Sequence, residues 1–306
     1  MKRVISLLVC IVCVVLLSAC SSPSVSDDGI LKIVVTAFPH YDFARQLTKN
    51  IDNVEIKMLI SPGSEVHTYE PTPSDILAIS ECDLLICTGG ESDTWIDGIV
   101  ESSGNKQMQI ISFMDICYIS KHQDHDGHEH EYDEHVWTSP SNVLFIATHM
   151  TEALCDKDKE NAGKIRENYE FFLGKTNEII NEFEDIAKSR IRDEIIVADR
   201  FPFYHLANEV GFEYSAAYPG CSSSTEPSAA VIAELSDKVK REKIPYVFTI
   251  EFSNQKIAKN VISGTDAKIL TLHSCHTVTA EEFESGITYY DLMKQNAQNL
   301  RKALCE

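Results

Sequence analysis

Histidines are concentrated in residues 121–135, a segment with the sequence KHQDHDGHEHEYDEH. Neutral imidazole is a good ligand for zinc, copper and nickel, so a histidine tract of this density predicts metal binding. The segment is too polar to bury a core, and we therefore expect a loop without fixed geometry. Such a loop should capture metal weakly rather than form the main site. Its histidines are His122, His125, His128, His130 and His135.

Two motifs of hydrolytic enzymes do not occur in the sequence. There is no H-E-x-x-H segment, which holds a catalytic zinc ion, and no G-x-S-x-G segment, which presents a nucleophilic serine. A catalytic zinc site could still keep water in an open coordination position. A zinc hydrolase therefore remains the alternative to a protein that binds metal without chemistry.

Apolar runs that fit buried strands alternate along the sequence with segments that fit helices, and these elements must position the metal-binding residues. This alternation predicts an α/β fold with parallel sheets flanked by helices. Residues 72–75 show a helix start, with a capping threonine, a proline in the first turn and an acid at the third position. We expect strands at residues 32–37, 54–60, 83–87, 109–113, 195–198, 214–217, 246–250 and 269–272.

Residues 156–190 break this alternation, because apolar side chains recur there at helical spacing. At about 30 residues, the predicted helix is much longer than the average helix of a globular protein. We expect it to be a rigid spine that joins two lobes.

The first residues predict export. Lys2 and Arg3 precede an apolar run at residues 4–17, which is too short to favour a membrane-spanning helix and fits a signal peptide. The run ends in Leu-Ser-Ala-Cys, which resembles the lipobox of bacterial lipoproteins. This resemblance implies that cleavage leaves an acylated Cys20 as the new N-terminus. Residues 21–29 then read as a flexible tether between the lipid and the folded part.

The charge of the chain excludes one class of partner. The formal net charge is −20, and the phosphates of a nucleic acid would repel such a protein. The same charge favours the accumulation of cations near the surface.

Two longer motifs resemble those of the zinc/manganese-specific solute-binding lipoproteins of ABC importers. Residues 67–75, HTYEPTPSD, are similar to the first ligand motif of that family, and residues 133–140, DEHVWTSP, to the second. Gly89-Gly90-Glu91, followed by Trp95, is similar to a loop of the family's N-terminal lobe. A histidine-rich insertion before the second motif is typical of the zinc-type members. The likeness extends over nearly all of the mature sequence.

The resemblance implies two α/β lobes joined by a long rigid helix, with the metal between the lobes. We divide the chain accordingly into a signal peptide at residues 1–19, a lipidated tether at 20–29, an N-terminal lobe at 30–155, a linking helix at 156–190 and a C-terminal lobe at 191–306. The resemblance also implies that His67 and His135 are metal ligands from the N-terminal lobe.

The C-terminal lobe departs from the family pattern. Ala198 stands where the third histidine is expected, and His273 stands where relatives usually have a carboxylate. The resemblance therefore implies a ligand set of His67, His135 and His273. Three imidazoles and one further donor fit tetrahedral zinc, whereas manganese prefers more oxygen ligands. The fourth donor is left open between Asp199, Cys221, Glu251 and a water.

Other candidate groups receive weaker assignments. Cys221 is equally compatible with thiolate ligation and with a disulfide to Cys275. We expect His205 on a helix surface, His276 as a group that orients a ligand, and both His40 and His149 in structural roles.

The functional expectation is a zinc-binding subunit of an ABC importer that delivers Zn(II) to a membrane permease. We expect a monomer attached to the cell membrane through Cys20, without catalytic activity and without nucleic acid. A surface adhesin is a third alternative, since some members of the resembling family have been described as adhesins, but the sequence shows no repeat or adhesive module.

Overall fold

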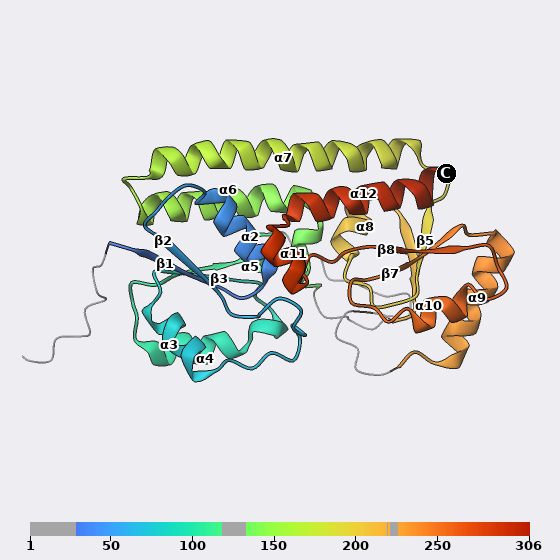
Figure 1. The fold of residues 1–306 in the computed structure, drawn as a ribbon, viewed down its shortest axis with the longest axis horizontal. Helices are drawn as coiled ribbons and strands as arrows, with labels where there is room; N and C mark the ends of the chain where they lie inside the picture. The colour runs from blue at the N-terminus through green and yellow to red at the C-terminus, as the bar shows by residue number, and fades with distance from the viewer. Residues whose placement is uncertain (1–28, 118–132, 219, 221–225) are drawn as a thin grey trace, which may run out of the picture. The chain divides into compact units, whose positions relative to one another are not determined.

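The computed structural model describes residues 29–117, 133–218, 220 and 226–306 (Figure 1). The predicted signal peptide, Cys20 and most of the tether lie outside the described residues, as do residues 121–132 of the histidine-rich segment. Within the described ranges, no helix combines the length and the apolar character that crossing a membrane requires.

The N-terminal lobe is built on a parallel sheet with the strand order β2-β1-β3-β4. Strand β3 is buried along its whole length, which explains its continuous apolar sequence, LLIC. The strands are β1 (Leu31–Val35), β2 (Val54–Met58), β3 (Leu84–Cys87) and β4 (Gln109–Ser112). The helices of this lobe are α2 (Phe38–Leu47), α3 (Pro73–Glu81), α4 (Trp95–Ser103) and α5 (Phe113–Ile116), with a short 3₁₀ helix η1 (Glu91–Asp93).

The C-terminal lobe repeats this arrangement with the strand order β6-β5-β7-β8, again all parallel. Its strands are β5 (Glu194–Val197), β6 (Glu213–Ala216), β7 (Tyr246–Thr249) and β8 (Lys268–Thr271). Its helices are α8 (Tyr204–Val210), α9 (Ala229–Glu242), α10 (Lys256–Val261) and α11 (Ala280–Ser285). The predicted α/β class is confirmed, and every predicted strand ends within two residues of its observed bounds.

The predicted linking helix is shorter than expected at its N-terminal end. Residues 156–157 still belong to helix α6 (Pro140–Lys157), and helix α7 (Ala162–Ser189) begins after a short break. Helix α7 contacts α2 and α6 of the first lobe as well as α8 of the second, so it does join the two lobes (Figure 1). The C-terminal helix α12 (Tyr289–Cys305) lies along α7 and also contacts α2.

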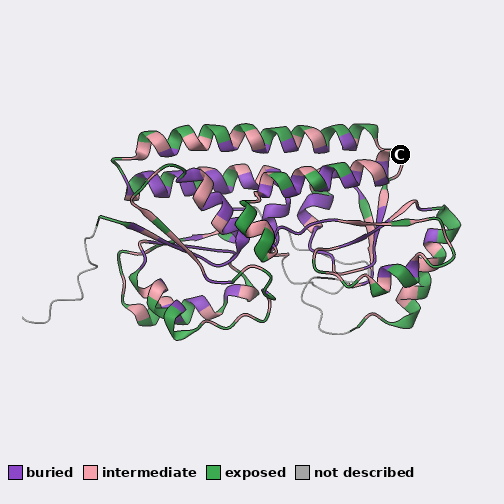
Figure 2. Cartoon of the chain, viewed as in Figure 1, coloured by how far each residue is buried: buried purple, intermediate pink, exposed green. Residues whose placement is uncertain are grey.

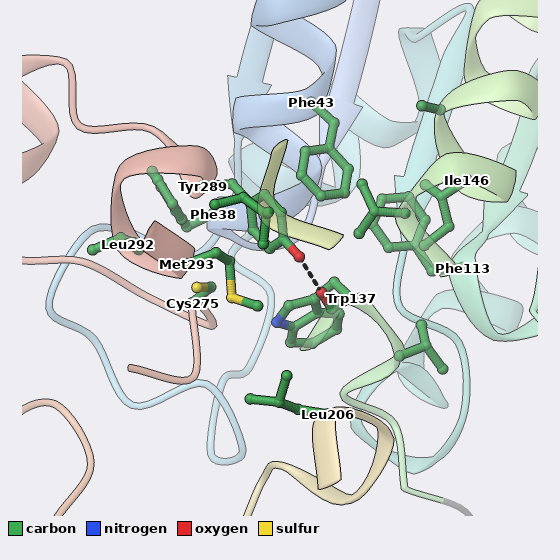
Figure 3. Close-up of a cluster of buried hydrophobic side chains, with 14 of the residues drawn as sticks. Phe38, Phe43, Phe113, Trp137, Ile146, Leu206, Cys275, Tyr289, Leu292 and Met293 are labelled. Atoms are coloured by element: carbon green, nitrogen blue, oxygen red, sulfur yellow. Dashed lines mark hydrogen bonds between the residues drawn. The ribbon is translucent and has the colours of Figure 1, made fainter. Parts of the chain in front are cut away.

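One cluster of buried apolar side chains contains residues of both lobes, including Val35 of β1 and Val197 of β5. The buried faces of α6 and α12 belong to it (Figure 2). At its centre Trp137 is fully buried, and the hydroxyl of Tyr289 donates a 2.7 Å hydrogen bond to the Trp137 carbonyl (Figure 3). The residues next to Trp137 in sequence are therefore fixed on a packed core.

Candidate metal centre

Three histidines converge on one point. Each of His67, His135 and His276 offers one ligand atom, and these atoms lie within 4.8 Å of one another. The ring centroids are separated by 5.9 Å for His67 and His135, 5.4 Å for His67 and His276, and 5.0 Å for His135 and His276. Among the described residues this is the one group of histidine, cysteine and acidic side chains with this geometry.

His67 lies in the loop between β2 and α3, and the rest of its motif anchors that loop. Asp75 accepts hydrogen bonds from the Tyr69 hydroxyl at 2.8 Å and the Thr72 hydroxyl at 2.7 Å, and Lys57 lies 2.9 Å from its other oxygen. Burial opposes ionisation of Asp75, but the Thr72 and Lys57 hydrogen bonds outweigh it and lower its pKa to about 2. Residues 67–75 thus contain His67 and, at the start of α3, an ionised and hydrogen-bonded Asp75 that anchors the loop.

His135 is held by its own motif, just before the 3₁₀ helix η2 (Val136–Thr138). The carboxylate of Asp133 accepts from the His135 backbone N–H at 2.8 Å and lies 3.0 Å from its ring Nδ1. Burial would raise the pKa of Asp133, but the charge and hydrogen bonds of His135 lower it. An ionised Asp133 fixes the proton on Nδ1 and leaves the lone pair on Nε2, the arrangement usual for a metal-binding histidine.

His276 comes from the other lobe, in the loop after β8. Its ring packs on the Trp137 indole with centroids 4.9 Å apart, and its backbone N–H donates to the Ser274 hydroxyl at 3.1 Å. The buried Nε2 of His276 has no hydrogen-bond partner among the described residues. Burial and then the neighbouring histidines, His135 first, hold the pKa of His276 well below its usual range, so the ring is neutral. A neutral imidazole with a spare ring nitrogen is suited to a metal ion.

The loops that carry these ligands are joined across the two lobes. The Trp137 indole N–H donates to the Ser274 carbonyl at 2.9 Å, and the Gly63 backbone N–H donates to the Thr277 hydroxyl at 3.2 Å. Arg200 also lies 3.5 Å from Glu65, two residues before His67. The three histidines therefore belong to one connected set of loops.

The structure does not bring His273 into this group, although the ligand set expected from the sequence included it. The Nδ1 of His273 accepts the Cys275 backbone N–H at 2.9 Å, and Asn296 bonds both the N–H and the carbonyl of His273. A neutral ring that accepts at Nδ1 carries its proton on Nε2, so neither nitrogen offers a lone pair to a metal. Cys275, the residue before His276, has a φ of 60°, which is uncommon for a residue other than glycine, and His276 lies in the histidine group.

The candidate fourth donors lie outside the group as well. The Ser253 hydroxyl and the Arg200 backbone N–H both donate to Asp199, while Glu251 accepts from the N–H and the hydroxyl of Ser274. Asp199 and Glu251 line a cavity of about 260 Å³ at the carboxyl ends of β5 and β7, together with Ala198. Cys221 lies outside the described residues, and Cys275 is a free, buried thiol rather than half of a disulfide.

The remaining histidines divide into structural and positioning groups. His40 is fully buried, with Nδ1 near the Ala37 N–H at 3.3 Å, and burial lowers its pKa to about 3. His149 is exposed on α6 and bonds the Phe145 carbonyl at 2.8 Å. The prediction for His205 is wrong, because its side chain is buried and its Nε2 lies 2.9 Å from the Asp133 carbonyl. His205 thus positions the segment that carries His135.

Comparisons with known proteins agree with this architecture. A family model described as zinc-uptake complex component A, periplasmic, matches residues 33–303. The chain is 29% identical over 311 residues to the zinc-binding lipoprotein AdcA of Streptococcus pneumoniae; the match covers 99% of this chain but 61% of that protein. It is also 29% identical to the high-affinity zinc uptake system protein ZnuA of Bacillus subtilis, over 99% of this chain and 98% of that protein.

A solved structure gives the same result for the fold. The metal-dependent lipoprotein YcdH of Bacillus subtilis superposes with a TM-score of 0.76 at 27% identity, over 89% of this chain and 98% of that chain. Both lobes are therefore shared with a solved relative. Since the family model spans most of the sequence, this chain belongs to the family of zinc-uptake complex component A, the ZnuA family.

Proposed function

We propose that this protein is the extracytoplasmic zinc-binding subunit of an ABC importer, which captures Zn(II) and delivers it to a membrane permease. The observation that supports this most directly is the convergence of His67, His135 and His276 from both lobes. Relatives named for zinc binding and zinc uptake support the same metal. The match to AdcA covers 61% of that longer protein.

The proposed metal ligands are the imidazoles of His67, His135 and His276, with His276 taking the place expected for His273. Zinc binds imidazole nitrogen at about 2.0–2.1 Å in a tetrahedron, so small ring rotations must bring the three ligand atoms slightly closer together. Three nitrogen donors favour zinc over manganese, which prefers oxygen. Asp199 and Glu251 are engaged in other hydrogen bonds, which leaves water and Cys221 as the candidates for the fourth position.

The proposed role is binding without catalysis, at a membrane surface. Acylation of Cys20 would hold the protein at the outer face of the cell membrane, and the tether would leave the lobes free to meet a permease. The histidines of residues 121–132 precede Asp133 and His135 directly in the chain. We assign them an accessory role, in which they raise the local concentration of zinc near the main site.

The test is zinc binding by the soluble chain from residue 21, measured by competition with a chromophoric chelator. Removal of any one imidazole of the three should weaken the tight site, and His149→Gln, an exposed histidine on α6, is the matched control. Zinc-edge absorption should show nitrogen and oxygen at about 2.0–2.1 Å; a sulfur shell near about 2.3 Å would instead indicate Cys221. A tight site that is indifferent to all three histidines would overturn the proposal. Growth on limiting zinc, with and without the protein, tests import itself.

A further inference from the structure

We propose that Glu134 is a positioning residue for His67, and that it acts through the hydroxyl of Ser92. The inference rests on the proposed function, in which His67 and His135 bind the metal. The tripeptide Asp133-Glu134-His135 would then provide one proposed ligand, His135, and the two side chains that orient His135 and His67. Asp133 fixes the ring of His135 directly, whereas Glu134 reaches across to the ligand on the other loop.

The first support is the contact between Glu134 and Ser92. One carboxylate oxygen of Glu134 accepts the Ser92 backbone N–H at 3.0 Å, and the other accepts the Ser92 hydroxyl. The Ser92 carbonyl in turn accepts the Trp95 indole N–H at 3.0 Å. The N–H, the hydroxyl and the carbonyl of Ser92 are all held, so the position of its oxygen is well defined.

The second support is the direction of the hydrogen bonds. The Ser92 oxygen lies 3.5 Å from Nδ1 of His67. Because the hydroxyl proton goes to Glu134, the oxygen faces His67 with its lone pairs and favours a proton on Nδ1. The lone pair of His67 is then on Nε2, as it is for His135. A separation of 3.5 Å is at the long limit of a hydrogen bond, so this contact biases the ring rather than locking it.

The third support is the shape of the loop that carries Ser92. Gly90 has a φ of 79°, and a Cβ at this position would lie 2.7 Å from a Glu134 carboxylate oxygen. The Asp93 carboxylate holds the turn by accepting the N–H groups of Thr88 at 2.7 Å and Gly89 at 3.1 Å. The two glycines and Asp93 thus make a turn into which the Glu134 side chain fits.

The test compares Ser92→Ala and Glu134→Gln with Thr94→Ala. Thr94→Ala removes an exposed hydroxyl from the same loop, and among the described residues this hydroxyl donates to the Glu91 carbonyl alone. Zinc affinity is measured by chelator competition. Ser92→Ala and Glu134→Gln should each weaken zinc about 10-fold, the lower end for groups that orient a ligand, because the contact is long. Ser92→Thr, which keeps the hydroxyl, should restore affinity, and Thr94→Ala should have no effect.

A double-mutant cycle separates this role from simple fastening of the loop. In a His67→Ala background, read with a weaker chelator, Ser92→Ala should change affinity by less than about twofold, whereas Asp133→Asn should still weaken it. Long-range ¹H–¹⁵N spectra of the metal-free protein should show the His67 proton on Nδ1 in the wild type and a mixture in Ser92→Ala. Equal losses with and without His67, or an unchanged tautomer, would overturn the proposal. A wild-type protein that binds no zinc would instead refute the proposed function.

Discussion

His273 and His276 lie three residues apart, and we expect different effects on zinc affinity when each is replaced by asparagine. In His276→Asn the metal loses a ligand, while the amide fills much of the space of the ring against Trp137. In His273→Asn the side-chain oxygen can still accept the Cys275 N–H that Nδ1 accepts now. The two variants therefore make the same change in side-chain volume and charge at neighbouring positions of one loop. They differ in whether the replaced side chain is a proposed metal ligand.

The expected magnitude for His276→Asn follows from its place in the site. Groups that merely orient a ligand are worth about 10–100-fold in affinity, so loss of a ligand should cost at least about 100-fold. That corresponds to about 2.7 kcal/mol of binding free energy. At a zinc concentration of about 1,000 Kd, the stabilisation by zinc should fall from about 4.1 to about 1.4 kcal/mol. The zinc-dependent rise in Tm should then shrink by about 5 °C.

The metal-free protein should respond differently. The buried Nε2 of His276, which has no hydrogen-bond partner among the described residues, is replaced in His276→Asn by another polar group, so the Tm without zinc should change little. Calorimetric melting with and without zinc, together with chelator competition, measures both effects. The reasoning is refuted if His273→Asn loses as much affinity as His276→Asn, or if His276→Asn binds zinc as tightly as the wild type.

Three further predictions concern the anchor, the loop and pH. Cys20→Ala should release the protein from membranes, and retention after salt washing would contradict the anchor. Deletion of residues 124–131 should lower zinc stoichiometry in calorimetric titration but leave one tight site, whose loss would make the loop the main site. Metal-free protein should lose stability as pH falls below about 6.5, because His40 and His276 stay neutral when folded while the unfolded chain protonates them. Burial opposes this loss at lower pH, because it raises the pKa of Asp93 to about 6 and also raises the pKa of Asp42. The pH dependence is read from urea unfolding, and stability that rises between about pH 7 and about pH 6 would show that the histidines protonate when folded.

The central strands β1, β3, β5 and β7 were predictable because each is a short, mostly apolar run that is covered on both faces. β3, with all four residues buried, is the clearest case. The break between α6 and α7 was not predictable from periodicity, since apolar positions on both sides fit one continuous helix. Only the contact of the two helices with each other shows that the chain turns back at residues 158–161.

The histidine group was predictable where a proposed ligand lies inside a rigid local motif. His67 and His135 are followed by capped helix starts that fix their loops, and both are in the group. In the loop after β8 no periodic pattern decides which side chain faces inward. The left-handed turn at Cys275 makes that choice, and a non-glycine residue gives little sign of such a turn. His205 was misplaced for a related reason, because α8 packs on η2 and buries it.

Trp137 explains how the proposed metal site can be formed before metal binds. Its ring packs on the rings of His135 and His276, and its indole N–H holds the carbonyl of Ser274, two residues before His276. Its own carbonyl is held by Tyr289 in the core (Figure 3). Histidines that pack on a fully buried side chain lose little conformational freedom when they bind zinc, so ordering these side chains reduces the zinc affinity less. His67, half-buried on its own loop, is the exception, and it is the ligand for which support by Ser92 and Glu134 matters most.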